Sequence, residues 1–286
     1  PWLIRFLNSA NWDKVDETTS SLLALHASCF RLYQDLVKEI GAEDLIVESP
    51  VIHLYKKEED FKGALSIWEI LKNKGIDYEE LDEPLVRENE PNLSSDYQFG
   101  VLFRNSGFSS NPFRLVEKMT ERFLSDGGEF IHESVQYINP GEQENITLKL
   151  ENREIQSERV LVAAGAWSHQ LASQLGVKIP LETERGYHVT LNSKEGGPQN
   201  IVMEAGHKFM ATPMEMGVRF AGTAEFAGLK TPANQTRAEI LLKLGKKMYP
   251  QLEDGESSDW MGHRPSLPDS RPVIDFCPNN KKIIFA

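Results

Sequence analysis

The fold is decided by one short stretch, VLVAAGAWS at residues 160–168. Its apolar start predicts a buried strand, and the small residues Ala163, Ala164 and Gly165 let a backbone pass close to a ligand at the C-terminal edge of a parallel sheet. Trp167 opens a predicted helix, whose N-terminus suits a phosphate or a ribose. Ordinary packing of a strand against a helix gives the same run, so the stretch alone leaves both interpretations open.

The segments around this stretch predict one half of a dinucleotide-binding α/β domain. A helix starts at Asn111-Pro112, with proline at its first position, and stops before Gly127-Gly128. Strands are predicted at residues 129–133, 135–138, 146–150, 154–156 and 159–165, and a helix at residues 167–175. Helix, strand, β-meander, strand and helix is the order expected of such a half-domain.

The remaining segments alternate between helical and strand-like patterns. We predict helices at residues 18–40, 61–74 and 237–249, strands at residues 51–55, 98–103 and 281–285, a strand-rich region at residues 181–222, and a turn-rich segment from Asp259. The predicted layout is interleaved. It comprises a helical segment associated with the cofactor domain (1–50), the substrate domain (51–108), the cofactor domain (109–180), the substrate domain again (181–262) and a return to the cofactor domain (263–286).

Composition and charge exclude several classes of protein. The 286 residues carry a formal net charge of −12, which argues against a nucleic-acid-binding surface with clustered Lys and Arg. No apolar run approaches the roughly 20 residues needed to span a bilayer. Contact with a membrane surface needs only a patch and stays open. We expect a cytoplasmic location, or a peripheral one at the inner face of a membrane.

The cysteines and histidines give no sign of a metal site. Cys29 and Cys277 are the only cysteines, and two distant cysteines favour buried small side chains in a reducing compartment over a disulfide. Neither CxxC nor HExxH occurs, and the seven histidines show no ligand spacing. We therefore expect no zinc site.

Both ends of the sequence are unusual. It opens on Pro1-Trp2 without an initiator methionine or a signal peptide, and it stops in the apolar run Ile283-Ile284-Phe285-Ala286. Natural domains seldom end inside a strand, because backbone groups are then left unpaired. We expect a fragment that lacks both termini of its parent.

Four motifs, in the same order and spacing, resemble the FAD-dependent D-amino-acid oxidase superfamily. They are VLVAAGAWS at residues 160–168, GYHVTL at 186–191, RFAGTAEF at 219–226 and WMGHRPSLPDS at 260–270. The resemblance covers essentially the whole chain and is closest to the small subunit of D-amino-acid dehydrogenase. It implies an incomplete Rossmann-like FAD-binding domain interleaved with an α+β substrate domain built on a mostly antiparallel sheet.

The resemblance also implies roles for particular residues. Arg264 stands where the family grips the substrate carboxylate over the flavin, and a guanidinium fork suits that task because it binds a carboxylate bidentately. Tyr187 is a candidate second wall or hydroxyl donor, with a core tyrosine as the equal alternative. His263 replaces a residue that is usually apolar, and a structural role competes with a catalytic one.

The cofactor contacts are implied in the same way. Val135 matches a position whose backbone meets the adenine, and Ala163, Ala164 and Gly165 belong to the cofactor-contacting strand. Trp167 is a candidate shield for the adenosine end, with core packing as its alternative. The G-x-G-x-x-G loop and the glycine-rich flavin-contacting segment are absent from the sequence, so we expect that these 286 residues alone do not hold FAD and are inactive.

The implied chemistry is hydride transfer from Cα of an amino acid to flavin N5, followed by hydrolysis of the imine to a 2-oxo acid. The substrate is expected to be a small amino acid, with a D-amino acid first. A glycine or sarcosine oxidase-like enzyme and a non-catalytic binding protein on the same scaffold are the alternatives. The electron acceptor is left open between oxygen, a quinone and an electron-transfer protein.

Overall fold

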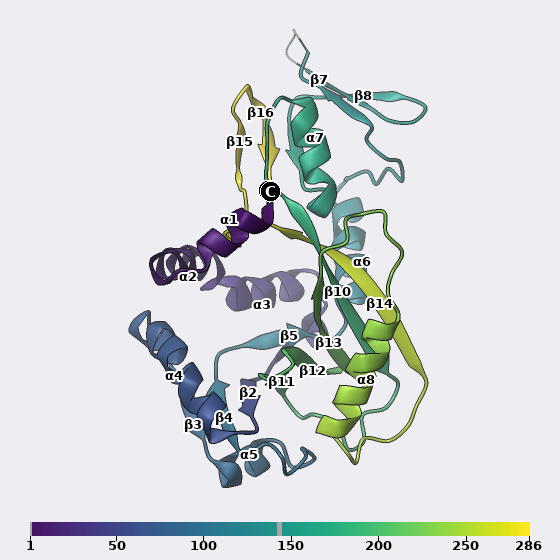
Figure 1. Ribbon diagram of the computed structural model, residues 1–286. Coiled ribbons are helices and arrows are strands. Elements are labelled where there is room, and N and C mark those ends of the chain that lie inside the picture. Colours follow the sequence, from purple (N-terminus) through teal and green to yellow (C-terminus); the bar gives the residue numbers. More distant parts are fainter. Residues whose placement is uncertain (1, 142–144) are drawn as a thin grey trace.

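The computed structural model describes residues 2–141 and 145–286. In this part of the chain, the strands form one eight-stranded sheet, two three-stranded sheets and a two-stranded ribbon. The eight-stranded sheet occupies the lower half of Figure 1, and the two three-stranded sheets lie at the top. The helices α1 (Trp2–Ser9), α2 (Trp12–His26) and α3 (Cys29–Glu39) lie on the left of the view, below the two three-stranded sheets.

The large sheet draws its strands from two distant parts of the sequence. Its order is β14 (Ser257–Ser266), β10 (Glu182–Leu191), β13 (Gly217–Glu225), β12 (Phe209–Met214), β11 (Ile201–Glu204), β2 (Val51–Tyr55), β4 (Phe99–Phe103) and β3 (Glu79–Leu81). Every neighbouring pair is antiparallel except β11 with β2. The predicted mostly antiparallel sheet is confirmed.

Successive side chains of a strand point to opposite faces of a sheet, and the two faces of β10 differ. On one face Tyr187, Val189 and Leu191 join the main core, which helix α8 (Thr236–Met248) covers. We call this the closed face. The other, which we call the open face, carries Glu184, Gly186 and His188 together with their cross-strand partners on β14.

The open face continues across the sheet toward β2 and β4. His188, Ala221, Met210, Met203 and His53 lie in one row of paired residues. Helix α4 (Glu58–Asn73) covers the far end of this row, where its Trp68 meets the His53 ring edge-on. At the near end, Trp260 of β14 leaves 58% of its surface exposed.

The three-stranded sheets stand apart from the large one. Strand β9 (Val160–Val162) runs parallel to β16 (Asn280–Phe285), which pairs with β15 (Asp275–Cys277). The meander contains β6 (Tyr137–Asn139), β7 (Ile146–Lys149) and β8 (Glu154–Ser157). Their apolar side chains share a core with helix α7 (Ser168–Gln174). The predicted parallel pairing of the 159–165 strand is confirmed, although the strand is shorter than predicted.

The other elements are η1 (Glu43–Leu45), β1 (Ile46–Glu48), α5 (Glu83–Asn89), β5 (Gly107–Ser109) and α6 (Pro112–Ser125). Helix α6 has the predicted bounds, and the Asn111 side chain accepts a hydrogen bond from the backbone N–H of Arg114 at its N-terminus. Strand β1 pairs with β5 as a two-stranded ribbon.

Three sequence predictions were wrong. The predicted helix at residues 18–40 is two helices, α2 and α3, separated by Ala27 and Ser28. Apolar spacing could not reveal this break, because both helices keep the spacing. Residues 129–133 form no strand, since no neighbouring strand of the described chain pairs with them. The segment from Asp259 to Ser266 is not turn-rich but belongs to the ten-residue strand β14.

Candidate active site

Four of the five predicted cofactor residues line one hollow beside the C-terminal end of β9. The hollow has a volume of about 760 Å³, and Val135, Ala163, Ala164 and Trp167 are among its lining residues. Val135 is 37% exposed and Trp167 is 47% exposed. Exposed apolar side chains around a hollow at a sheet edge suit a flat aromatic ligand. The structure therefore brings these four residues together around one hollow.

Gly165, the fifth predicted cofactor residue, makes the turn out of the strand. Its φ is +52°, in the left-handed region that glycine enters without penalty. A Cβ added here would meet no atom within 4 Å, so backbone conformation rather than space calls for glycine. The chain then enters the 3-10 turn η2 (Gly165–Trp167) and helix α7.

Trp167 connects the hollow to β14. The rings of Trp167 and His263 meet edge-on, with their centroids 5.3 Å apart. His263 Nδ1 is also hydrogen-bonded to the Thr183 hydroxyl at 2.9 Å. His263 thus joins the hollow to the large sheet, and the next residue of the same strand is Arg264.

Arg264 lies on the open face with its guanidinium held at two atoms. Nη1 donates to Glu184 Oε1 at 2.9 Å, and Nη2 donates to the Thr223 carbonyl at 3.3 Å. The side chain remains 49% exposed. An arginine carries five N–H donors, so three donors of Arg264 have no partner in the described chain. These free donors can donate hydrogen bonds to a carboxylate.

Two glycines let the side chains of this face lie flat on the sheet. Gly186 and Gly262 are cross-strand partners. A Cβ at Gly186 would collide with the guanidinium of Arg264, and a Cβ at Gly262 would collide with the ring of Trp260. Trp260 in turn stacks on His188, with ring centroids 5.1 Å apart. The open face therefore carries the guanidinium of Arg264 over Gly186 and the ring of Trp260 over Gly262, both packed close to the backbone.

The backbone is strained beside Arg264. Thr223 has a φ of +61°, a conformation that is rare for a β-branched residue. The strand β13 carries an irregularity here, where its register with β10 shifts between Arg185 and Tyr187. The Thr223 carbonyl accepts from Arg264, while its hydroxyl is buried without a partner in the described residues. Strain of this kind costs on the order of 1–3 kcal/mol and clusters at functional sites.

Tyr187 lies on the closed face and is not brought together with Arg264. Its side chain is 3% exposed. Its hydroxyl donates to Glu225 Oε2 at 2.6 Å and accepts from the Asn234 backbone N–H at 3.0 Å. From the sequence, a substrate role and a core role are equal alternatives for Tyr187, and these contacts favour the core role.

The closed face also buries an ion pair that the sequence analysis did not single out. Arg185 is fully buried and donates to Glu225, to the Tyr187 hydroxyl and to the Thr231 and Pro232 carbonyls. The Tyr187 hydroxyl, followed by the Arg185 guanidinium, lowers the pKa of Glu225. The sequence carries one signal for this network: Arg185 stands two residues before Tyr187 on a predicted strand. Residues two apart on a strand share one face of the sheet, so a buried Tyr187 implies a buried Arg185.

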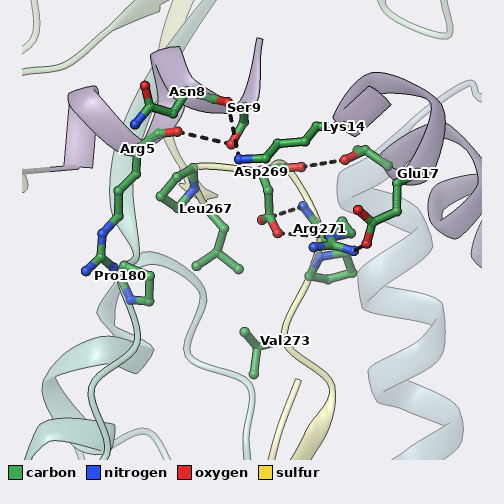
Figure 2. Close-up of a pocket in the computed structure, with 13 residues that line it drawn as sticks. Arg5, Asn8, Ser9, Lys14, Glu17, Pro180, Leu267, Asp269, Arg271 and Val273 are labelled. Carbon is green, nitrogen blue, oxygen red and sulfur yellow. Dashed lines mark hydrogen bonds and ion pairs between the residues drawn. The ribbon is translucent and has the colours of Figure 1, made fainter. Parts of the chain in front are cut away.

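A second hollow, of about 610 Å³, lies where α1 and α2 meet the loop that follows β14. Figure 2 shows Arg271 between two carboxylates: Nη1 lies 2.7 Å from Glu17 of α2, and Nε lies 2.9 Å from Asp269. The Thr18 hydroxyl donates to the Asp269 carbonyl at 3.4 Å. These contacts tie the loop after Arg264 to the N-terminal helices.

The comparisons with known proteins fit this arrangement. The model of the DAO family, described as FAD dependent oxidoreductase, matches residues 5–286. The chain belongs to this family. The sequence-based predictions of a FAD-dependent oxidoreductase and of FAD as its cofactor are thereby confirmed.

Two relatives and one solved structure illustrate the similarity. A D-amino-acid oxidase of Bradyrhizobium diazoefficiens is 34% identical over 292 residues, covering 100% of this chain and 69% of that protein. A D-amino acid dehydrogenase of Dechloromonas aromatica is 26% identical over 284 residues, covering 96% and 68%. The crystal structure of glycine oxidase from Geobacillus kaustophilus matches with a TM-score of 0.82 at 20% identity, covering 93% and 73%. At that identity the structural match shows the fold alone.

The remaining sequence-based expectations concern metals, cysteines and membranes. Within the described residues, no group of three or more His, Cys, Asp or Glu side chains is placed to hold a metal ion. Cys29 and Cys277 are both free. None of the helices in residues 2–141 and 145–286 has the length and apolar character to cross a membrane.

Proposed function

We propose that the protein oxidises an amino acid, with D-amino acids as the first candidates, to the corresponding 2-oxo acid. The observation that carries this proposal is the guanidinium of Arg264. It is half-exposed, has three unpartnered donors, and lies on the strand that meets Trp167 at the cofactor hollow. D-amino-acid oxidase and D-amino acid dehydrogenase relatives support the substrate class.

Different residues of the chain would bind the substrate and the cofactor. Arg264 would bind the substrate carboxylate bidentately and thereby fix which face of Cα meets the cofactor. The hollow formed by Val135, Ala163, Ala164 and Trp167 would hold the adenosine end of FAD. When bound, FAD supplies the redox chemistry by accepting the hydride from Cα. The amine reacts in its neutral form, its proton having been lost to solvent, and water then hydrolyses the iminium product to the 2-oxo acid and ammonium.

Substitution of Arg264 tests the proposal in the FAD-loaded full-length protein, because these 286 residues alone are not expected to hold FAD. A charge-assisted hydrogen bond contributes about 1.5–3 kcal/mol, so Arg264→Ala should raise KM for an amino acid at least about 10-fold with FAD content unchanged. Arg264→Lys should recover only part of the loss, because an ammonium cannot reproduce the planar fork. Wild-type KM and kcat in Arg264→Ala would contradict the proposal.

A matched control exists in the same sheet. Arg104 pairs with Glu79 through two hydrogen bonds of 2.5 and 2.9 Å on an exposed surface at the opposite edge. Arg104→Ala should leave KM unchanged. A panel of D-amino acids, glycine and sarcosine then decides between the D-amino acid enzyme and the glycine or sarcosine oxidase-like alternative. Oxygen consumption compared with quinone reduction identifies the electron acceptor.

A further inference from the structure

Glu184 pairs with Arg264 through only one of its two carboxylate oxygens. Its Oε1 accepts from Arg264, and the two residues are direct cross-strand partners on β10 and β14. Oε2 has no hydrogen-bond partner in residues 2–141 and 145–286. The carboxylate is 25% exposed, so a ligand on the open face can reach it.

The Arg104–Glu79 pair shows what a closed ion pair looks like in this chain. There both carboxylate oxygens are engaged, by Nε and Nη2 of the same guanidinium. The two side chains are 63% and 51% exposed, against 49% and 25% for Arg264 and Glu184. The pair on the open face is less exposed and yet uses one contact only. Arg264 therefore keeps donors, and Glu184 keeps an acceptor oxygen, that their contact with each other does not use.

The geometry of the backbone keeps this arrangement open. Gly186, two residues along β10 from Glu184, leaves room for the guanidinium to lie across the strand. The strained Thr223 carbonyl holds Nη2 from the other side. Arg264 is thus fixed by two acceptors beside a carboxylate with a free oxygen, and a cation and an anion are presented side by side.

We propose that Glu184 binds the α-ammonium group of the substrate while Arg264 binds its carboxylate. This inference rests on the proposed function. An amino-acid zwitterion carries its two charged groups on the same carbon atom, Cα, and the Arg264–Glu184 pair offers the complementary charges at neighbouring positions. Glu184 is then a specificity residue: it favours 2-amino acids over 2-hydroxy acids and simple carboxylates, which bring no cation to its free oxygen Oε2.

The test uses Glu184→Gln in the FAD-loaded enzyme with two kinds of ligand. The amide keeps the size of the side chain and removes its charge. KM for the preferred amino acid should rise at least about 10-fold. The inhibition constant of a simple carboxylate, such as propionate, should fall or stay unchanged, because a like charge beside the bound carboxylate has been removed. Glu79→Gln, the matched control on the surface, should change neither value.

Two outcomes would overturn the proposal. If Glu184→Gln weakens the amino acid and propionate equally, Glu184 only positions Arg264. If it changes neither, Glu184 lies outside the substrate site. Failure of the proposed function itself is distinguishable, because in that case the unsubstituted protein would oxidise no amino acid, or Arg264→Ala would leave KM for the amino acid and the inhibition constant of propionate unchanged.

Discussion

The two faces of β10 place an arginine–glutamate pair in opposite settings. On the closed face, Arg185 is fully buried and makes four hydrogen bonds, and its partner Glu225 is also engaged by Tyr187. On the open face, Arg264 makes two hydrogen bonds and stays half-exposed. The closed arginine uses four of its five donors within the protein, whereas the open arginine uses two. The two pairs have the same residue types and differ in how many hydrogen-bonding groups they leave unused.

The largest expected effect is on stability and separates the two arginines. Arg185→Met leaves the Glu225 carboxylate without its main cation in a poorly hydrated place, and breaking a buried pair costs about 3–5 kcal/mol. Arg264→Ala should cost less than about 1 kcal/mol, because exposed ion pairs contribute little. Urea unfolding of both variants measures the difference. Equal losses would show that the two faces are not distinct in the way described.

Tyr187→Phe sharpens the comparison on the closed face. Removing the hydroxyl takes a donor from Glu225 and an acceptor from the Asn234 N–H, which should lower the free energy of unfolding by about 1–3 kcal/mol. KM for the substrate should stay within about twofold. A raised KM at unchanged stability would instead assign Tyr187 to the substrate site, the alternative that its sequence context left open.

Acid should lower the free energy of unfolding of the protein through two histidines on the open face, His53 and His188. Burial lowers the pKa of His53 to about 4, and burial followed by the charge of Arg219 lowers the pKa of His188 to about 4. Both values lie below the usual 6.5 of an unfolded chain. The unfolded state therefore binds more protons between pH 6.5 and 4, and stability is lost as the pH falls through this window.

The size of this effect can be checked by substitution. By pH 5.5 each histidine should account for a loss of roughly 1 kcal/mol in the free energy of unfolding, after allowance for its partial hydration. His53→Gln should flatten the dependence of unfolding on pH between 6.5 and 4. An unchanged slope in that variant would show that His53 is hydrated enough to be protonated in the folded protein.

Local signals in the sequence predicted the elements better than their pairing. Helix α6 was found at its correct bounds, because Asn111-Pro112 and Gly127-Gly128 mark its ends in the sequence itself. Strand β14 differs from the predicted turns, because Gly262, Pro265 and the nearby Pro268 are residue types typical of turns. Pro265 is tolerated in the strand because β14 is the edge strand of its sheet. Residues 129–133 have the composition of a strand, but no partner strand in the described chain.

Residues of the candidate site could be predicted from the sequence only where they belong to a family motif. Arg264 and the residues of the cofactor hollow came from resemblance to a family. Glu184 could not be found in this way, because its proposed role depends on its pairing with Arg264. The two residues are 80 positions apart in the sequence. The face on which Tyr187 lies follows from the same register. The predicted division into domains stays a prediction.

The pairing of β10 with β14 runs without interruption through ten residue pairs, from Glu182–Ser266 to Leu191–Ser257. Because neighbouring residues of a strand point to opposite faces, one residue inserted into β14 before Arg264 would put His263 in its place on the open face, and one residue deleted there would put Pro265 in its place. The segment at residues 192–256 contains β11, β12 and β13 of the same sheet, so only the loops between these elements could change in length without such a shift. Designed variants that extend or shorten this protein should therefore leave the strands of this sheet intact.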